Sequence, residues 1–127
     1  MKLNQVTVPS IDVSRASEFY RKLGFELIVN AAPNYLRFLC PDNESTFSVH
    51  LVDKLPEGEG IYLYFECEDL DGIVAQLRMD GIKFMHDPKD QSWLWREARL
   101  KDPDGNQLIL FKAGENRINP PWRVKQE

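Results

Sequence analysis

The chain has 127 residues, of which 43% are hydrophobic and 28% are charged, values typical of one globular domain with a modest core. Its formal net charge is −4 without a basic cluster, which argues against a nucleic-acid-binding surface. No apolar run approaches the roughly 20 residues that cross a bilayer, and the first residues lack the apolar region of a signal peptide, so no membrane partner is expected.

The first half of the chain predicts one strand, one helix and three further strands. The first strand spans residues 3–8 and is expected to end at Pro9. The helix follows, capped by Asp12 or Ser14 at its start and stopped by Gly24. The further strands are expected at 25–29, 35–40 and 46–52, with a turn at 41–43. Residues 53–60 are polar and contain proline and glycine, so they are expected to form a linker.

The second half predicts the same order of elements. A strand at 61–67 leads to a helix that Asp69 caps and Gly81 ends, with an apolar stripe at positions 70, 73, 74 and 77. Strands are expected at 82–85, 93–101 and 107–112, and residues 102–106 give the strongest hairpin signal in the chain. The tail, 113–127, predicts no regular element, and Trp122 is expected to anchor it on the body or on a partner.

The two halves nearly repeat at a spacing of 57 residues. Asp12 corresponds to Asp69, Gly24 to Gly81, and the helix stripe from Val13 to that from Leu70. Neither copy is long enough to be stable alone, so we expect one α+β domain over 1–127. Its modules cover about 3–52 and 61–112, related by a pseudo-twofold axis, with a concave ligand-binding surface between them.

The two cysteines indicate the compartment. Cys40 and Cys67 occupy alternate, inward positions of predicted strands, which is typical of buried free thiols rather than of a disulfide. A reducing cytoplasm is therefore the expected location.

Strand alternation gathers polar and aromatic side chains on one face. Trp93, Trp95, Glu97 and Arg99 share a face of their predicted strand, and Ile109 lies roughly opposite Arg99 across the hairpin. Tyr62 and Tyr64 share a face of another strand, as do Tyr35 and Arg37. One interpretation is an aromatic ligand site, with Arg37 and Arg99 for a carboxylate or phosphate and Glu97 for a cation. The other is packing of the tryptophans under the tail or at a dimer interface.

Several local motifs coincide with this doubled unit. They are Phe19-Tyr20 before Leu23-Gly24-Phe25, the helix start at 68–71, and Asp102-Pro103-Asp104-Gly105-Asn106 before the last strand. The chain from 3 to 112 thereby resembles the vicinal-oxygen-chelate superfamily, which includes glyoxalase I, bleomycin-resistance proteins, fosfomycin-resistance enzymes and extradiol dioxygenases. The resemblance implies tandem β-α-β-β-β modules that form a half-open barrel with a concave cleft.

The resemblance also implies where a metal would bind. The positions that match the family's ligands are Gln5, His50, Tyr62 and Ile109. Isoleucine cannot ligate, and a neutral tyrosine is a weak ligand, so no cofactor is expected. If a divalent metal binds, Gln5 and His50 are its ligands, and an iron–tyrosinate with Tyr62 is the one exception. His50 is expected as a hydrogen-bonded group in the cavity wall or as a candidate catalytic base, and His86 as a surface-loop residue.

These inferences favour a small-molecule-binding protein with a degenerate metal site, similar to bleomycin-resistance proteins. The alternatives are a metal-dependent lyase or isomerase like glyoxalase I, and a non-enzymatic interaction domain that binds a chain segment. Whether the protein is an enzyme stays open at this point. The partners expected are a small ligand and a second copy in a homodimer. The site residues expected are Gln5, His50, Tyr62, Tyr64, Trp95, Glu97, Arg99 and Ile109.

Overall fold

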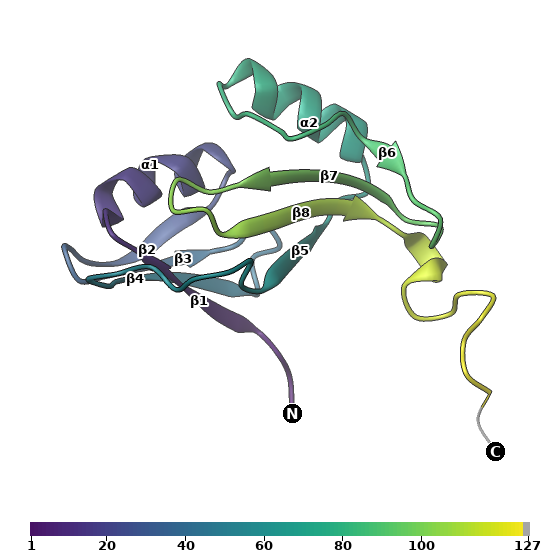
Figure 1. The fold of residues 1–127 in the computed structure, drawn as a ribbon, viewed down its shortest axis with the longest axis horizontal. Helices are drawn as coiled ribbons and strands as arrows, with labels where there is room; N and C mark the ends of the chain where they lie inside the picture. Colours follow the sequence, from purple (N-terminus) through teal and green to yellow (C-terminus); the bar gives the residue numbers. More distant parts are fainter. Residues whose placement is uncertain (126–127) are drawn as a thin grey trace. The chain divides into compact units, whose positions relative to one another are not determined.

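The computed structural model describes residues 1–125, which divide into two compact units. Unit 1 contains residues 1–61 and 101–106, and unit 2 contains 62–100 and the chain from 107 onward. The elements, in chain order (Figure 1), are β1 Gln5–Ser10, α1 Val13–Lys22, β2 Glu26–Ala31, β3 Tyr35–Leu39, β4 Thr46–Leu51, β5 Tyr62–Glu66, α2 Leu70–Met79, β6 Lys89–Asp90, β7 Arg96–Lys101, β8 Gln107–Lys112 and a 3-10 turn at Gly114–Asn116.

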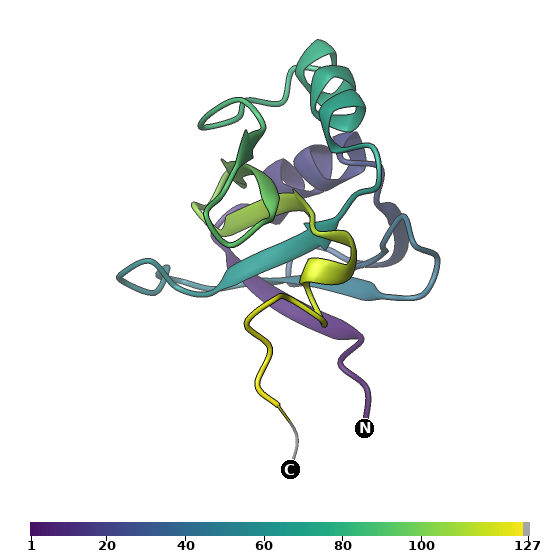
Figure 2. The same ribbon diagram turned by 90° about the vertical axis from the view of Figure 1, so that its right-hand side faces the viewer.

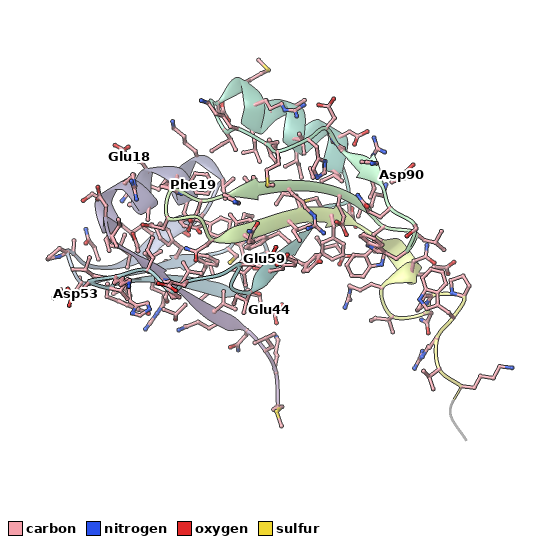
Figure 3. All side chains as sticks on the ribbon, viewed as in Figure 1. Glu18, Phe19, Glu44, Asp53, Glu59 and Asp90 are labelled. Atoms are coloured by element: carbon pink, nitrogen blue, oxygen red, sulfur yellow. The ribbon has the colours of Figure 1, made fainter. Side chains whose placement is uncertain are left out.

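Unit 1 is a four-stranded sheet in the order β1-β4-β3-β2, with β1 parallel to β4 and the other pairs antiparallel. Helix α1 buries Tyr20 against one face of this sheet, while Glu18, labelled in Figure 3, is exposed. The Tyr20 ring lies 4.6 Å from that of Phe47 and 5.6 Å from that of Phe25, measured between centroids. An aromatic core thus fixes which face of the sheet the helix covers.

Unit 2 has the equivalent sheet, in the order β5-β8-β7-β6, with β5 parallel to β8. Helix α2 buries Leu70, Val74 and Leu77 from its apolar stripe, and β8 runs beside β7 (Figure 1). Figure 2 shows the tail leaving unit 2 after the 3-10 turn that follows β8. Each unit is therefore one sheet with one helix, which confirms the predicted α+β class with tandem modules.

The repeat of 57 residues holds at the helix ends, because α2 begins and ends 57 positions after α1. Asp12 and Asp69 each cap a helix by accepting from the backbone N–H three residues on, at 3.1 Å in both cases. Gly24 and Gly81 follow the helices with φ of +92° and +95°, a left-handed conformation that only glycine adopts cheaply. The residue after each glycine donates back to the helix, so both copies end in a Schellman motif.

The turn at 102–106 is fixed by one carboxylate, that of Asp102, which is only 4% exposed. Its Oδ2 accepts from the hydroxyl of Tyr20 at 2.6 Å and from Asn106 Nδ2 at 2.7 Å. Its Oδ1 accepts from the backbone N–H groups of Asp104 and Asn106, both at 2.9 Å. Burial, followed by the charge of Asp102, raises the pKa of Tyr20 far above its ordinary value. The motif thus attaches the turn to helix α1 within unit 1.

Some predicted boundaries are wrong. The first strand does not end at Pro9 but continues to Ser10, because β1 is an edge strand and a missing N–H there interrupts no ladder. No strand forms at 82–85, where the Ile82 N–H bonds back to Leu77 O of the helix and the Met85 N–H bonds to Arg99 O at 2.8 Å, and the short β6 follows at Lys89–Asp90.

The strand predicted at 93–101 begins only at Arg96. Leu94 has φ of +68°, so residues 91–95 form a turn rather than extended backbone. The tail contains the 3-10 turn that the sequence did not predict, and Trp122 is 58% exposed, so it is not packed on the body of the chain, while its packing on a partner stays a prediction. Within residues 1–125, no helix has the length and apolar character needed to span a membrane.

Candidate functional site

The face of the unit 2 sheet opposite α2 carries most of the predicted site. Leu63 and Leu108 are register partners buried on the helix side, so the next pair, Tyr64 and Ile109, points to the opposite face. Tyr62 and Tyr64 are 38% and 43% exposed there, which leaves their rings accessible.

An aromatic cluster forms the centre of this face. The Trp95 ring stacks on Phe111 with centroids 4.7 Å apart and planes inclined by 22°. Tyr64 meets both rings edge-on, at 5.7 Å from Trp95 and 5.6 Å from Phe111. The indole Nε1 of Trp95 donates to the backbone oxygen of Asn116 at 3.1 Å, so the start of the tail holds the ring in place. We call Tyr62, Tyr64, Trp95 and Phe111 the aromatic face.

A buried ion pair lies on the same side of the sheet. The Glu97 side chain is fully buried and accepts from Trp93 Nε1 at 2.9 Å. Arg99 Nη2 also donates to Glu97, at 3.2 Å, and its guanidinium carbon lies 5.5 Å from the centroid of the Tyr62 ring. Glu97 therefore neutralises the charge of Arg99. The sequence-based interpretation, in which Arg99 pairs with an anionic group of the ligand, did not include this partner. Trp93 belongs to this pair through its indole, although it lies in a turn rather than in β7.

Gln5 and His50 lie in unit 1, on the sheet face opposite α1. Gln5 Oε1 accepts from Thr46 Oγ1 at 2.8 Å. His50 is exposed and is the register partner of Tyr35 on β3 and of Pro9 on β1. Of the predicted site residues, unit 2 thus holds Tyr62, Tyr64, Trp95, Glu97, Arg99 and Ile109 on one side of its sheet. His86 is half-buried in the loop before β6, where its Nδ1 lies 2.7 Å from the backbone oxygen of Asp87.

The sequence did not predict the polar cluster that lies beside His50. Tyr35 Oη lies 2.6 Å from Ser48 Oγ, and Arg37 Nε donates to Tyr35 Oη at 3.0 Å. The hydrogen bond with Ser48, followed by that from Arg37, lowers the pKa of Tyr35 despite the opposing effect of burial. The predicted turn at 41–43 did not give this pairing, because a hairpin centred on residue 42 pairs Arg37 with Phe47, one residue away from the observed partner Ser48.

The four family ligand positions do not fit a divalent metal. Ile109 is 1% exposed and has no donor atom, and the Gln5 amide oxygen already accepts a hydrogen bond. Among residues 1–125, no group of three or more His, Cys, Asp or Glu side chains converges as metal ligands would. Both cysteines are free, and burial, followed by the charge of Asp42, raises the pKa of the Cys40 thiol to about 11. Burial also raises the pKa of Cys67, so neither is a ready thiolate ligand.

Solved structures share this architecture. A bleomycin-binding protein complexed with bleomycin is 23% identical, covers 88% of this chain and 98% of its own, and superposes with a TM-score of 0.74. Lactoylglutathione lyase from Agrobacterium tumefaciens is 16% identical, covers 97% of both chains, and gives a TM-score of 0.72. At these identities the likeness establishes the fold alone.

Comparison at the level of sequence identifies the family as well as the fold. A trivalent organoarsenical cleaving enzyme from Bacillus sp. (strain MD1) is 26% identical over 137 aligned positions, 95% of this chain and 81% of that enzyme. The profile of the Glyoxalase/Bleomycin resistance protein/Dioxygenase superfamily matches residues 2–110, almost the whole of both modules. With the doubled helix caps and the two matched sheets, this match shows that the chain belongs to the glyoxalase/bleomycin resistance protein/dioxygenase superfamily.

Proposed function

We propose that the protein binds a small organic molecule on the aromatic face of unit 2. The observation that carries this proposal is the exposed pair Tyr62 and Tyr64 beside the stacked rings of Trp95 and Phe111, next to a fully buried Glu97. Burying a carboxylate costs folding free energy, and an apolar residue at this position would be sufficient if packing were its only role. Aromatic walls with a few fixed polar groups are typical of ligand sites.

The ion pair determines what the ligand presents to this face. Because Glu97 neutralises Arg99, a ligand anion gains little there, and we propose a ligand with an aromatic or aliphatic body. Arg99 uses Nε and Nη2 toward Glu97, so its remaining N–H groups are donors for a neutral ligand oxygen. The indole N–H of Trp93 keeps the carboxylate oriented during binding.

The binding experiment is a tryptophan-fluorescence titration with bleomycin and with S-lactoylglutathione, the compounds that the structural relatives suggest. Tyr64→Ala and Trp95→Ala should weaken binding of a compound that the native protein binds, because each removes part of the aromatic face. Trp122→Ala, an exposed tryptophan of the tail, is the matched control and should leave the affinity unchanged. Affinity that is lost only in Trp122→Ala would contradict the proposal.

We propose that binding needs no metal, since the ligand positions are degenerate. The rival is a metal-dependent lyase of the lactoylglutathione lyase type, with Gln5 and His50 as ligands. Elemental analysis of protein purified without chelator separates the two. Near one equivalent of Zn, Ni, Mn or Fe, lost in Gln5→Ala or His50→Ala, would establish the rival and would make His50 a candidate catalytic group.

The organoarsenical-cleaving relative supports a second rival activity. A trivalent organoarsenical should be incubated with the protein and the release of arsenite measured, with and without added Fe²⁺. Burial raises the pKa of both Cys40 and Cys67, which lowers the fraction of reactive thiolate available to trivalent arsenic, so we expect no cleavage through these thiols.

One contact of the tail supports the alternative of an interaction domain that binds a chain segment. The Asn116 carbonyl already occupies one edge of the aromatic face through Trp95. Deleting residues 118–127 should not change small-molecule affinity if the face serves small molecules. A gain of affinity on deletion would instead mean that the tail is the segment bound there.

We also propose that residues 1–127 fold as one domain, form a homodimer and reside in the cytoplasm, where both thiols stay reduced. The turn at 101–106 belongs to unit 1 while the strands on both sides belong mainly to unit 2, which supports joint folding. A single calorimetric transition and a dimer mass in sedimentation are the expected results. Two separate transitions, or only monomer at micromolar concentration, would contradict these proposals.

A further inference from the structure

The unit 1 sheet carries a second polar centre that is independent of the aromatic face. Leu36 and Phe38 of β3 are buried on the side of α1, so Tyr35 and Arg37 lie on the opposite face. Arg37 is the register partner of Ser48 on β4, and Ser48 is the partner of Thr7 on β1. This row of polar residues crosses three neighbouring strands.

The charge of Arg37 is not neutralised by the protein. Arg15, Arg78, Arg96, Arg99 and Arg117 each lie within ion-pair distance of a carboxylate. For Arg37, no such carboxylate is found among residues 1–125, although its side chain is half-buried. Its Nε is bonded to Tyr35 Oη, and its guanidinium carbon lies 5.5 Å from the Tyr35 ring centroid. A half-buried guanidinium held in this way presents its outer N–H groups in a fixed orientation.

The hydrogen bonds around Tyr35 determine whether its phenol O–H is available to a ligand. Ser48 is fully buried, and Tyr35 Oη is the one hydrogen-bond partner of its hydroxyl among the residues described. Either oxygen can be the donor in this contact, and we assign that role to Ser48, because Tyr35 Oη already accepts from Arg37 Nε and its own O–H is then available to a ligand. Tyr35 Oη then accepts from both Ser48 and Arg37, and its own O–H is directed to neither. The phenol O–H of Tyr35 and the outer N–H groups of Arg37 therefore lie side by side, with no acceptor for either within residues 1–125.

We propose that Tyr35 and Arg37 form an oxyanion-binding subsite for the carboxylate or phosphate group of a small ligand. Guanidinium groups bind such oxyanions with two parallel hydrogen bonds, and the phenol adds a third donor. Arg99 does not offer this kind of anion recognition, because Glu97 neutralises its charge. The net charge of −4 makes general attraction of anions unfavourable, so binding there depends on these two side chains.

The test is an NMR titration that follows the arginine Nε–H signals of the full chain with inorganic phosphate and, separately, with benzoate. Sodium chloride at equal ionic strength is the control for screening. We expect a saturable shift of the Arg37 signal, which identifies whether phosphate, carboxylate or both are taken. In Arg37→Gln, the saturable shifts of the β3 and β4 backbone amide signals that accompany anion binding should be lost, and Tyr35→Phe should weaken the affinity about tenfold, because a hydrogen bond to a charged acceptor is lost.

Arg21→Gln is the matched control, since Arg21 is exposed in the last turn of α1, and it should leave the affinity unchanged. The Tyr35→Phe variant keeps the charge of Arg37 and so remains informative if Arg37→Gln folds poorly. No saturable shift at Arg37 with either anion, equal shifts at Arg37 and Arg21, or unchanged affinity in Tyr35→Phe would overturn the proposal. A failure here leaves the aromatic face untouched, because that face lies in unit 2.

Discussion

Removing Arg99 tests whether the buried ion pair is part of the folded core of the site. In Arg99→Ala, the fully buried Glu97 keeps only the indole N–H of Trp93 as a donor, at 2.9 Å. Breaking a buried pair typically costs about 3–5 kcal/mol because a charge is left uncompensated. The Arg99 side chain is 31% exposed, so water replaces part of the lost interaction and the lower end applies. We expect a loss of about 3 kcal/mol of unfolding free energy.

A double-mutant cycle makes this estimate specific. Glu97→Gln keeps the shape and the acceptor for Trp93, so it should cost about 1 kcal/mol. The combination with Arg99→Ala no longer buries a charge and should cost about 2 kcal/mol, less than the sum of about 4 kcal/mol. Urea unfolding monitored by fluorescence gives each value, with the exposed Arg21→Ala as control. Additive costs, or an Arg99→Ala loss below about 1 kcal/mol, would show that the pair is solvated.

The remaining predictions concern the two helices. Tyr20→Phe should cost about 1.5–3 kcal/mol near neutral pH, because the buried phenol donates to the Asp102 carboxylate. Since folding raises the pKa of Tyr20, native stability should fall above pH about 10 by up to about 1.4 kcal/mol per pH unit more steeply than that of Tyr20→Phe. Parallel pH profiles in urea unfolding would refute this linkage. Leu77→Ala should lower stability by about 2–5 kcal/mol, because the side chain is buried under the unit 2 sheet. A calorimetric change below about 0.5 kcal/mol would contradict that placement.

Local signals predicted the helices well. Each helix begins at an aspartate whose carboxylate caps it and ends at a glycine with positive φ, and both signals act within a few residues. The same pattern at a second position 57 residues later predicted the doubled unit. The strand at 93–101 could not be placed as well, because the positive φ of Leu94 has no signal in an apolar residue type.

The chemistry of the site was less accessible from the sequence. The alternation of side chains along the strand predicted that Glu97 and Arg99 share one face. The complete burial of Glu97 and its hydrogen bond from Arg99 depend on how the sheet packs, which alternation does not predict. The Tyr35 and Ser48 contact depends on strand register, and the predicted turn at 41–43 gives a register one residue away from the observed one. The role of Asp102 in holding Tyr20 depends on residues 82 positions apart, beyond any local pattern.

The central claim is that small molecules bind on the aromatic face of unit 2. The most direct measurement is an amide NMR screen of aromatic fragments against the full chain. The account predicts that shifts caused by the fragments that bind concentrate on β5, β7 and β8, at Tyr64, Glu97 and Phe111. Shifts confined to helix α2, or to the tail around Trp122, would contradict it, as would a screen in which no fragment perturbs the aromatic face.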